Sequence, residues 1–141
     1  MRRILYAFLI YTIIGLISGF YYRELTVAHH FTGDTQLKVL HTHLLMLGMF
    51  MHLVLLPFEK LFKLSSYYIF NWFFIIYNFG VLFTVAMMFM KGTYQVIGKT
   101  VPESFAGYAG IGHTVLTAGF VLLFFLLKNA LIKDPRDSYL E

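Results

Sequence analysis

The chain has 141 residues, of which 59% are hydrophobic and only 13% are charged, and its formal net charge is +4. Soluble domains usually have about a quarter of their residues charged, so this composition excludes an ordinary soluble fold and indicates a membrane protein. Because the chain has no cysteine, disulfides, iron–sulfur clusters and thiolate zinc sites are also excluded. Basic residues of membrane proteins mostly set orientation, so nucleic acid is not an expected partner.

Four apolar segments follow one another along the chain, each roughly 19 to 24 residues long: residues 4–22, 37–58, 67–90 and 105–127. A helix needs about 20 apolar residues to cross the hydrocarbon core, and lipid offers no hydrogen-bond partner to an exposed backbone. We therefore predict an all-α fold, in which residues 1–141 form a single domain, an integral membrane bundle of four transmembrane helices. The connecting loops are short, so any chemistry is expected within the bilayer or at its surface.

The basic residues predict how these segments are oriented. With four crossings, both chain ends and the middle loop lie on one side of the membrane, and the other two loops lie opposite. Lysines and arginines number seven on the first side and four on the second: Arg2, Arg3, Lys60, Lys63, Lys128, Lys133 and Arg136 against Arg23, Lys38, Lys91 and Lys99. Because such residues concentrate in cytoplasmic loops, we predict that both termini are cytoplasmic.

Histidines are the unusual polar residues of this chain. His41, His43 and His52 fall on the second predicted helix, and His113 falls on the fourth. An ionisable side chain inside a membrane helix is costly, so it marks a functional site unless it serves to hydrogen-bond another helix. Four such residues in so apolar a chain therefore require an explanation.

Helical geometry separates these histidines. At about 100° per residue, His41 and His43 point about 200° apart, so they cannot chelate one ion together and must face different neighbours. His52 shares the face of His41 but lies about 16 Å deeper. His41, His43 and His113 all fall one to two turns below the non-cytoplasmic surface. We therefore predict that these three form a functional layer and that His52 is structural.

The chemistry of imidazole predicts the cofactor. Imidazole is a good ligand for heme iron, copper or zinc. Two imidazoles give a six-coordinate heme b suited to electron transfer, and a single one leaves a position open for a gas. We predict heme b as the cofactor, copper being the less favoured metal, with His41, His43 and His113 as the residues that bind it and ligate the metal. Arg23, after the first apolar segment, is a candidate partner for a heme propionate, because guanidinium pairs well with carboxylate.

Other polar residues are predicted to join helices. A stripe from Tyr11 to Tyr22 lies on one face of the first helix, and Asn71 and Asn78 share a face of the third. We expect both to form interhelical hydrogen bonds, and we expect Gly15 and Gly19 to allow close packing. No hydrolase triad, paired carboxylate or nucleotide-binding fingerprint is present, which argues against hydrolytic and nucleotide-driven enzymes. Whether the protein turns over a substrate stays open, and no catalytic residue is predicted.

Part of the sequence resembles a known family. The segment TGDTQLKVLHTHLLMLGMFMHLVLLPFEK at residues 32–60, with GFYYREL at 19–25 and GIGHT at 110–114, resembles an uncharacterised family of small bacterial four-helix membrane proteins. That family carries a domain-of-unknown-function label. The resemblance covers most of the chain and implies its topology and a place in the bacterial inner membrane.

The His41-Thr42-His43 motif is also distantly similar to the catalytic subunit of heme–copper oxidases and nitric oxide reductases. That subunit has twelve helices in approximate threefold symmetry, four to each third, and a His-x-His helix that ligates a heme on each side. The resemblance implies a homotrimer that forms a twelve-helix ring, in which His41 of one copy and His43 of the next clamp a heme. The chain lacks the copper and tyrosine motif of the oxidases, so oxygen reduction and proton pumping are not implied.

Three functional interpretations follow from these observations. The first is a membrane b-type heme protein, for electron transfer with a redox partner or for binding and sensing nitric oxide or oxygen. The second is a metal-ion or small-solute transporter with an outer histidine site, which is weakened by the absence of Asp and Glu from the apolar segments. The third is a non-catalytic structural or assembly subunit, in which the histidines join helices.

Overall fold

The computed structural model describes residues 1–132, and over that range it is built of helices alone. Four helical spans are long and apolar enough to cross a membrane: Arg2–Ala28, Leu37–Phe62, Tyr68–Val96 and Gly107–Ile132. The predicted all-α fold with four spans is therefore confirmed, and these spans indicate a multi-pass membrane protein.

The elements follow the chain in a simple order. They are α1 (Arg2–Ala28), α2 (Leu37–His43), the π-helix η1 (Leu44–Phe50), α3 (Met51–Phe62), the short 3₁₀-helix η2 (Leu64–Ser66), α4 (Tyr68–Val96) and α5 (Ser104–Ile132). Several helices run further than predicted, because polar and aromatic residues at a membrane surface continue the backbone ladder beyond the apolar core. α1 thus includes Arg23 and Glu24, and α4 includes Lys91, all three of which were expected in loops.

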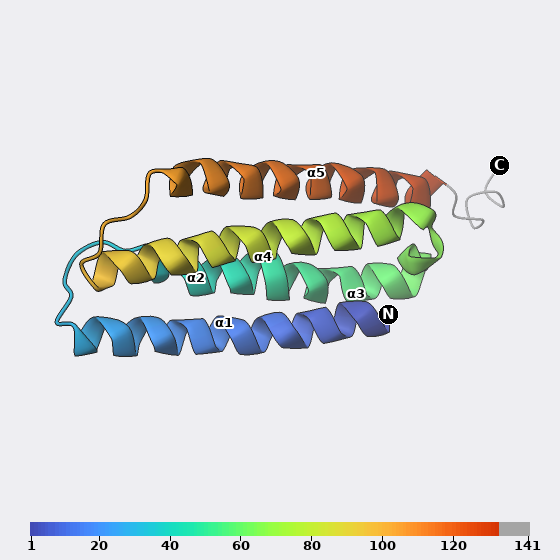
Figure 1. The fold of residues 1–141 in the computed structure, drawn as a ribbon. Helices are drawn as coiled ribbons and strands as arrows, with labels where there is room; N and C mark the ends of the chain where they lie inside the picture. The colour runs from blue at the N-terminus through green and yellow to red at the C-terminus, as the bar shows by residue number, and fades with distance from the viewer. Residues whose placement is uncertain (133–141) are drawn as a thin grey trace.

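The four spans lie side by side and alternate in direction (Figure 1). α1 packs along the continuous second span formed by α2, η1 and α3, and α4 packs on that span, while α5 packs mainly against α4. The N-terminus and the connection from α3 to α4 lie at one end of the bundle, and the other two connections lie at the opposite end. Of the residues that predict orientation, Lys133 and Arg136 lie outside the described range, and the orientation stays a prediction.

Glycines set the close approach of α1 to the second span. A Cβ atom at Gly15 would lie 2.7 Å from the Cδ2 atom of Leu45, and one at Gly48 would overlap the ring of Tyr11. Gly19 faces His41 at ordinary contact distance. The predicted close packing through Gly15 and Gly19 therefore occurs, and it brings the first two spans together along one seam.

The second span is interrupted by a π-helical segment, Leu44–Phe50, which lies between His43 and Met51. π-helical turns are rare within α-helices and occur frequently at functional sites, because each one widens the turn and changes which carbonyl groups are bonded. Here the segment separates the level of His41 and His43 from the level of His52.

Candidate functional site

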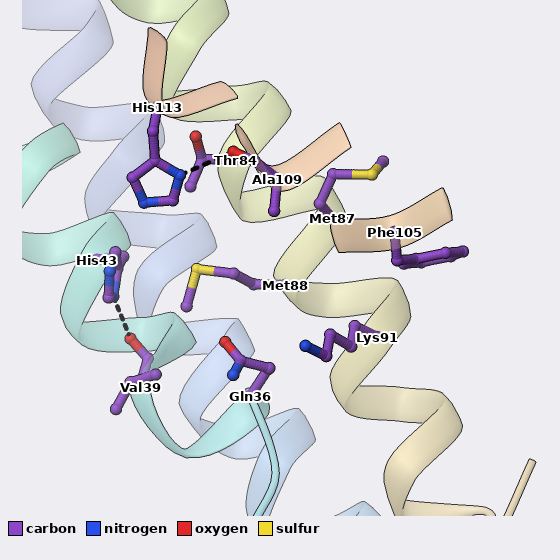
Figure 2. Close-up of a pocket in the computed structure, with 10 residues that line it drawn as sticks. All are labelled: Gln36, Val39, His43, Thr84, Met87, Met88, Lys91, Phe105, Ala109 and His113. Carbon is purple, nitrogen blue, oxygen red and sulfur yellow. Dashed lines mark hydrogen bonds between the residues drawn. The ribbon is translucent and has the colours of Figure 1, made fainter. Parts of the chain in front are cut away.

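A pocket of about 150 Å³ opens between α2, α4 and α5, at the end of the bundle opposite to the N-terminus (Figure 2). Its walls contain histidine, methionine, threonine and lysine side chains together with apolar ones. The lining residues are Gln36, Val39, His43, Thr84, Met87, Met88, Lys91, Phe105, Ala109 and His113. Two of the three histidines predicted to form a functional layer thus meet in one pocket.

Both histidines of the pocket are held by their own helices. The Nδ1 atom of His43 lies 2.9 Å from the carbonyl oxygen of Val39, and that of His113 lies 2.8 Å from the carbonyl oxygen of Ala109. A carbonyl oxygen only accepts, so each Nδ1 atom donates to it, and the Nε2 atom of each ring is the one left for a ligand. A hydrogen bond of this kind on the other ring nitrogen fixes the tautomer and the orientation of metal-ligating histidines. Both rings are therefore prepared to act as ligands through Nε2.

Thr84 of α4 adds a polar group to the same pocket. Its side chain is only 2% exposed, and within residues 1–132 its hydroxyl oxygen has no hydrogen-bond partner. This oxygen would lie 2.6 Å from a Cβ atom at Gly112, so it is packed into the close contact between α4 and α5. The hydroxyl is therefore enclosed by Gly112 at the edge of the pocket.

Sequence reasoning missed the contribution of α4 to the pocket. Thr84, Met88 and Lys91 follow one another at i, i+4 and i+7 on a single helical face, and that spacing could have revealed them. In Figure 2 the sulfur of Met88 lies toward the histidines, that of Met87 points away from them, and Lys91 brings a positive charge to the pocket. In the part of the chain that the structure describes, no group of three His, Cys, Asp or Glu could hold a metal ion.

His41 lies outside this pocket. It faces α1, because a Cβ atom added at Gly19 would lie 3.8 Å from the Cβ atom of His41. Its Nδ1 atom is buried and lacks a partner among the described residues, while its Nε2 atom lies 3.5 Å from the hydroxyl oxygen of Thr42. His41 and His43 thus face different neighbours, as their spacing predicts, and His113 joins His43 instead of His41.

Arg23 is also remote from the histidine pocket. It lies in the last turns of α1, where its guanidinium bonds the Glu24 carboxylate at 3.2 Å, and both side chains are more than half exposed. It is not among the residues that line the pocket. Lys91 is the cation that the structure brings to the histidines.

His52 occupies the centre of the bundle and is completely buried. Its Nδ1 atom donates to the carbonyl oxygen of Gly48 at 2.6 Å, and its Nε2 atom faces the Nδ2 atom of Asn78 at 3.4 Å. The Oδ1 atom of Asn78 accepts a hydrogen bond from the Tyr11 hydroxyl at 2.8 Å. The predicted interhelical bonding of Tyr11 and Asn78 is therefore present. A neutral His52 satisfies both of its ring nitrogens within the protein, in keeping with a structural role.

The fold and the pocket define a class, namely a four-helix multi-pass membrane protein with a histidine-lined pocket near one end. The chain belongs to the family described as protein of unknown function (DUF2871), whose model matches residues 1–130. No curated protein and no solved structure matches the chain. Its resemblance to an uncharacterised family is thus confirmed. Because that family has no known function, a function for this chain has to be argued from the site itself.

Proposed function

We propose that this protein is a membrane b-type heme protein in which His43 ligates the heme iron. His113 lies beside it, as a second ligand or as a hydrogen-bond partner of a molecule bound to the iron. The observation that carries this proposal is the convergence of the two histidines, from α2 and α5, on one pocket, each with Nδ1 bonded to its own helix and Nε2 left for a ligand.

The ligand set favours heme over a bare metal ion. A porphyrin supplies all the equatorial nitrogens, so the protein need contribute only axial ligands. A zinc ion takes most of its ligands from the protein, and residues 1–132 contain no cluster of three His, Cys, Asp or Glu. A bound heme would supply electron-transfer chemistry if both axial positions were imidazoles, and gas binding if one position were open.

The volume of the pocket supports a site shared between copies of the chain. About 150 Å³ is below the roughly 300–1,000 Å³ of pockets that enclose a drug-sized ligand, so one copy would hold only part of a porphyrin. α5 packs mainly against α4 and leaves large apolar side chains such as Phe124, which is 62% exposed, on the outside of the bundle, where another copy could pack. We therefore propose a homotrimer that forms a twelve-helix ring resembling the heme–copper oxidase subunit.

In that trimer, His41 of a neighbouring copy is the alternative to His113 as the second ligand, so that His41 of one copy and His43 of the next would clamp the heme. His41 is a candidate for this pairing because it does not line the pocket of its own chain. Because its Nδ1 atom is buried, its Nε2 atom, which lies beside the hydroxyl of the exposed Thr42, would be the ligand. Lys91, which replaces Arg23 as the expected partner of a propionate, lines the same pocket as His43. In the bacterial inner membrane with cytoplasmic termini, this site would lie near the outer face.

A second candidate function is the binding and transport of copper(I). The specific observation that favours it is the sulfur of Met88, which lies toward His43 and His113 in the pocket. Thioether and imidazole groups both suit copper.

The test is an analysis of the protein purified in detergent from cells supplied with heme and copper. Absorption spectra are recorded before and after reduction with dithionite, bound metals are measured by mass spectrometry, and the oligomeric state by light scattering. We expect a Soret band, sharp bands on reduction, iron in proportion to heme, and a trimer. Copper without porphyrin would support the second candidate. A colourless, metal-free protein would contradict both and favour a structural or assembly role.

A further inference from the structure

A second polar pocket is lined by residues at the N-terminus of the chain. The N-terminus lies at the end of the bundle opposite to the connection between α1 and α2 (Figure 1). The volume of this pocket is about 380 Å³. It is formed where the start of α1 meets η2 and the first turn of α4, and its lining residues are Met1, Arg2, Arg3, Ser65, Phe70 and Asn71. Phe70 is buried and forms the apolar part of the wall, while the two arginines are exposed at the opening.

The charge of this pocket is not compensated within the described chain. Arg3 donates a hydrogen bond to the Oδ1 atom of Asn71 at 2.8 Å, and the amide that receives it is neutral. Neither Arg2 nor Arg3 forms an ion pair with an acidic residue anywhere in residues 1–132. A guanidinium has several N–H donors, so Arg3 keeps most of them after bonding Asn71. Two arginines therefore present free donors and positive charge to one pocket.

The nearby carboxylate of Glu59 does not neutralise these arginines. Glu59 is only 6% exposed, and its Oε1 atom accepts from the ammonium group of Met1 at 2.9 Å. Its Oε2 atom accepts from the backbone N–H of Ser65 at 2.8 Å, and the Ser65 hydroxyl also donates to Oε1. Glu59 is thus fully bonded within the protein, which leaves the pocket to an external anion.

Aromatic residues place the pocket at the depth of lipid headgroups. Tyr68 and Trp72 flank Asn71 at the start of α4, and they are 78% and 51% exposed. Exposed tyrosine and tryptophan at the ends of spanning helices lie in the interfacial region of a bilayer. The positive end of the dipole of α4 also favours negative charge at this level.

We infer that this pocket binds the phosphate group of an anionic phospholipid. Guanidinium is the side chain that best matches phosphate, because its planar fork donates parallel hydrogen bonds. Basic pockets between transmembrane helices bind anionic headgroups in other membrane proteins. A free phosphate ion shares this chemistry, but the exposed aromatic residues beside the pocket favour a lipid, whose chains would lie along α1 and α4.

The test compares lipid binding in nanodiscs and uses the full chain with a tag at the C-terminus, since residues 1–3 line the pocket. Binding of phosphatidylglycerol and of phosphatidylcholine is measured by native mass spectrometry and by the shift in unfolding temperature. The variant Arg2→Gln/Arg3→Gln removes the two pocket charges. Lys60→Gln/Lys63→Gln is the matched control, because it removes two exposed charges from the same end of the bundle that do not line the pocket.

We expect phosphatidylglycerol to bind the wild type in preference to phosphatidylcholine. The arginine double variant should bind it roughly thirty-fold more weakly, since each basic residue near an anionic surface contributes to the attraction, and the lysine variant should keep most of the preference. Asn71→Asp is a second variant. It retains both arginines, so their contribution to membrane insertion and topology is unchanged. It should also weaken binding, because it gives Arg3 an acidic partner.

Two results would overturn this inference. Equal losses in the arginine and lysine variants would show that general surface charge, and not the pocket, attracts the lipid. Equal stabilisation by inorganic phosphate added to phosphatidylcholine nanodiscs would assign the site to a soluble anion. Neither readout depends on heme, so the outcome is separate from that of the proposed function.

Discussion

The ring of His52 stacks on the ring of Tyr11, with the two centroids 5.3 Å apart and the planes inclined by 25°. Asn78 joins the pair, since its side chain accepts from the Tyr11 hydroxyl and faces the Nε2 atom of His52. The three residues belong to α1, α3 and α4, so one polar cluster ties three of the four spans together. Because each ring nitrogen of His52 already faces a protein partner, this histidine supports the fold and is not available to a ligand.

Replacing His52 should therefore lower stability without removing a cofactor. We expect His52→Ala to lower the free energy of unfolding in detergent by about 3 kcal/mol, because it leaves a cavity and an unpaired Asn78 amide. Tyr11→Phe, which removes a single interhelical hydrogen bond, should lower it by about 1 kcal/mol. Denaturant unfolding followed by circular dichroism measures both. A folded His52→Ala protein that had lost its absorption bands would show that His52 is a ligand after all.

The seam between α1 and the second span offers a sharper test of packing. A methyl group at Gly48 would overlap the Tyr11 ring, so Gly48→Ala should destabilise the fold by about 1–3 kcal/mol. Gly107→Ala is the matched control, since no atom outside its own helix lies within 4 Å of a Cβ atom there, and alanine favours a helix by up to about 1 kcal/mol. Equal unfolding energies for the two variants would contradict the close approach of α1 to η1.

The structure predicts opposite roles for Lys91 and Arg23 in the binding of a heme propionate: Lys91 should contribute to it and Arg23 should not. Lys91 lines the histidine pocket, whereas Arg23 is paired with Glu24 at the end of α1. We expect Lys91→Gln to weaken hemin binding by about tenfold, and Arg23→Gln to leave it unchanged although it removes the same charge. Titration of the heme-free protein with hemin, followed by absorbance, measures both affinities. A loss confined to Arg23→Gln would restore Arg23 as the propionate partner.

Apolar length was sufficient to predict the four spans, because lipid leaves a long apolar segment no alternative to a helix. The opposite directions of His41 and His43 also followed from helical periodicity alone. The π-helix Leu44–Phe50 could not be predicted, because no local pattern in its apolar residues distinguishes a π-helical turn from an α-helical one.

The partners of the polar residues could not be predicted from the sequence either. Tyr11, Asn78 and His52 were each recognised as polar positions on their own helices, but their meeting depends on how three helices rotate against one another. In the same way, Thr84 and Lys91 became part of the histidine pocket only when α4 was placed between α2 and α5. Periodicity defines the face of a helix, and tertiary packing decides what that face meets.

The most direct test of the proposed function is the dithionite-reduced absorption spectrum of His43→Ala, recorded beside that of His29→Ala. His29 lies at the exposed end of α1, so its replacement controls for the loss of a histidine. If His43 ligates heme iron, the Soret and reduced bands will disappear from a folded His43→Ala protein and persist in the His29→Ala control. A folded His43→Ala protein with the full spectrum of the wild type would contradict the proposal.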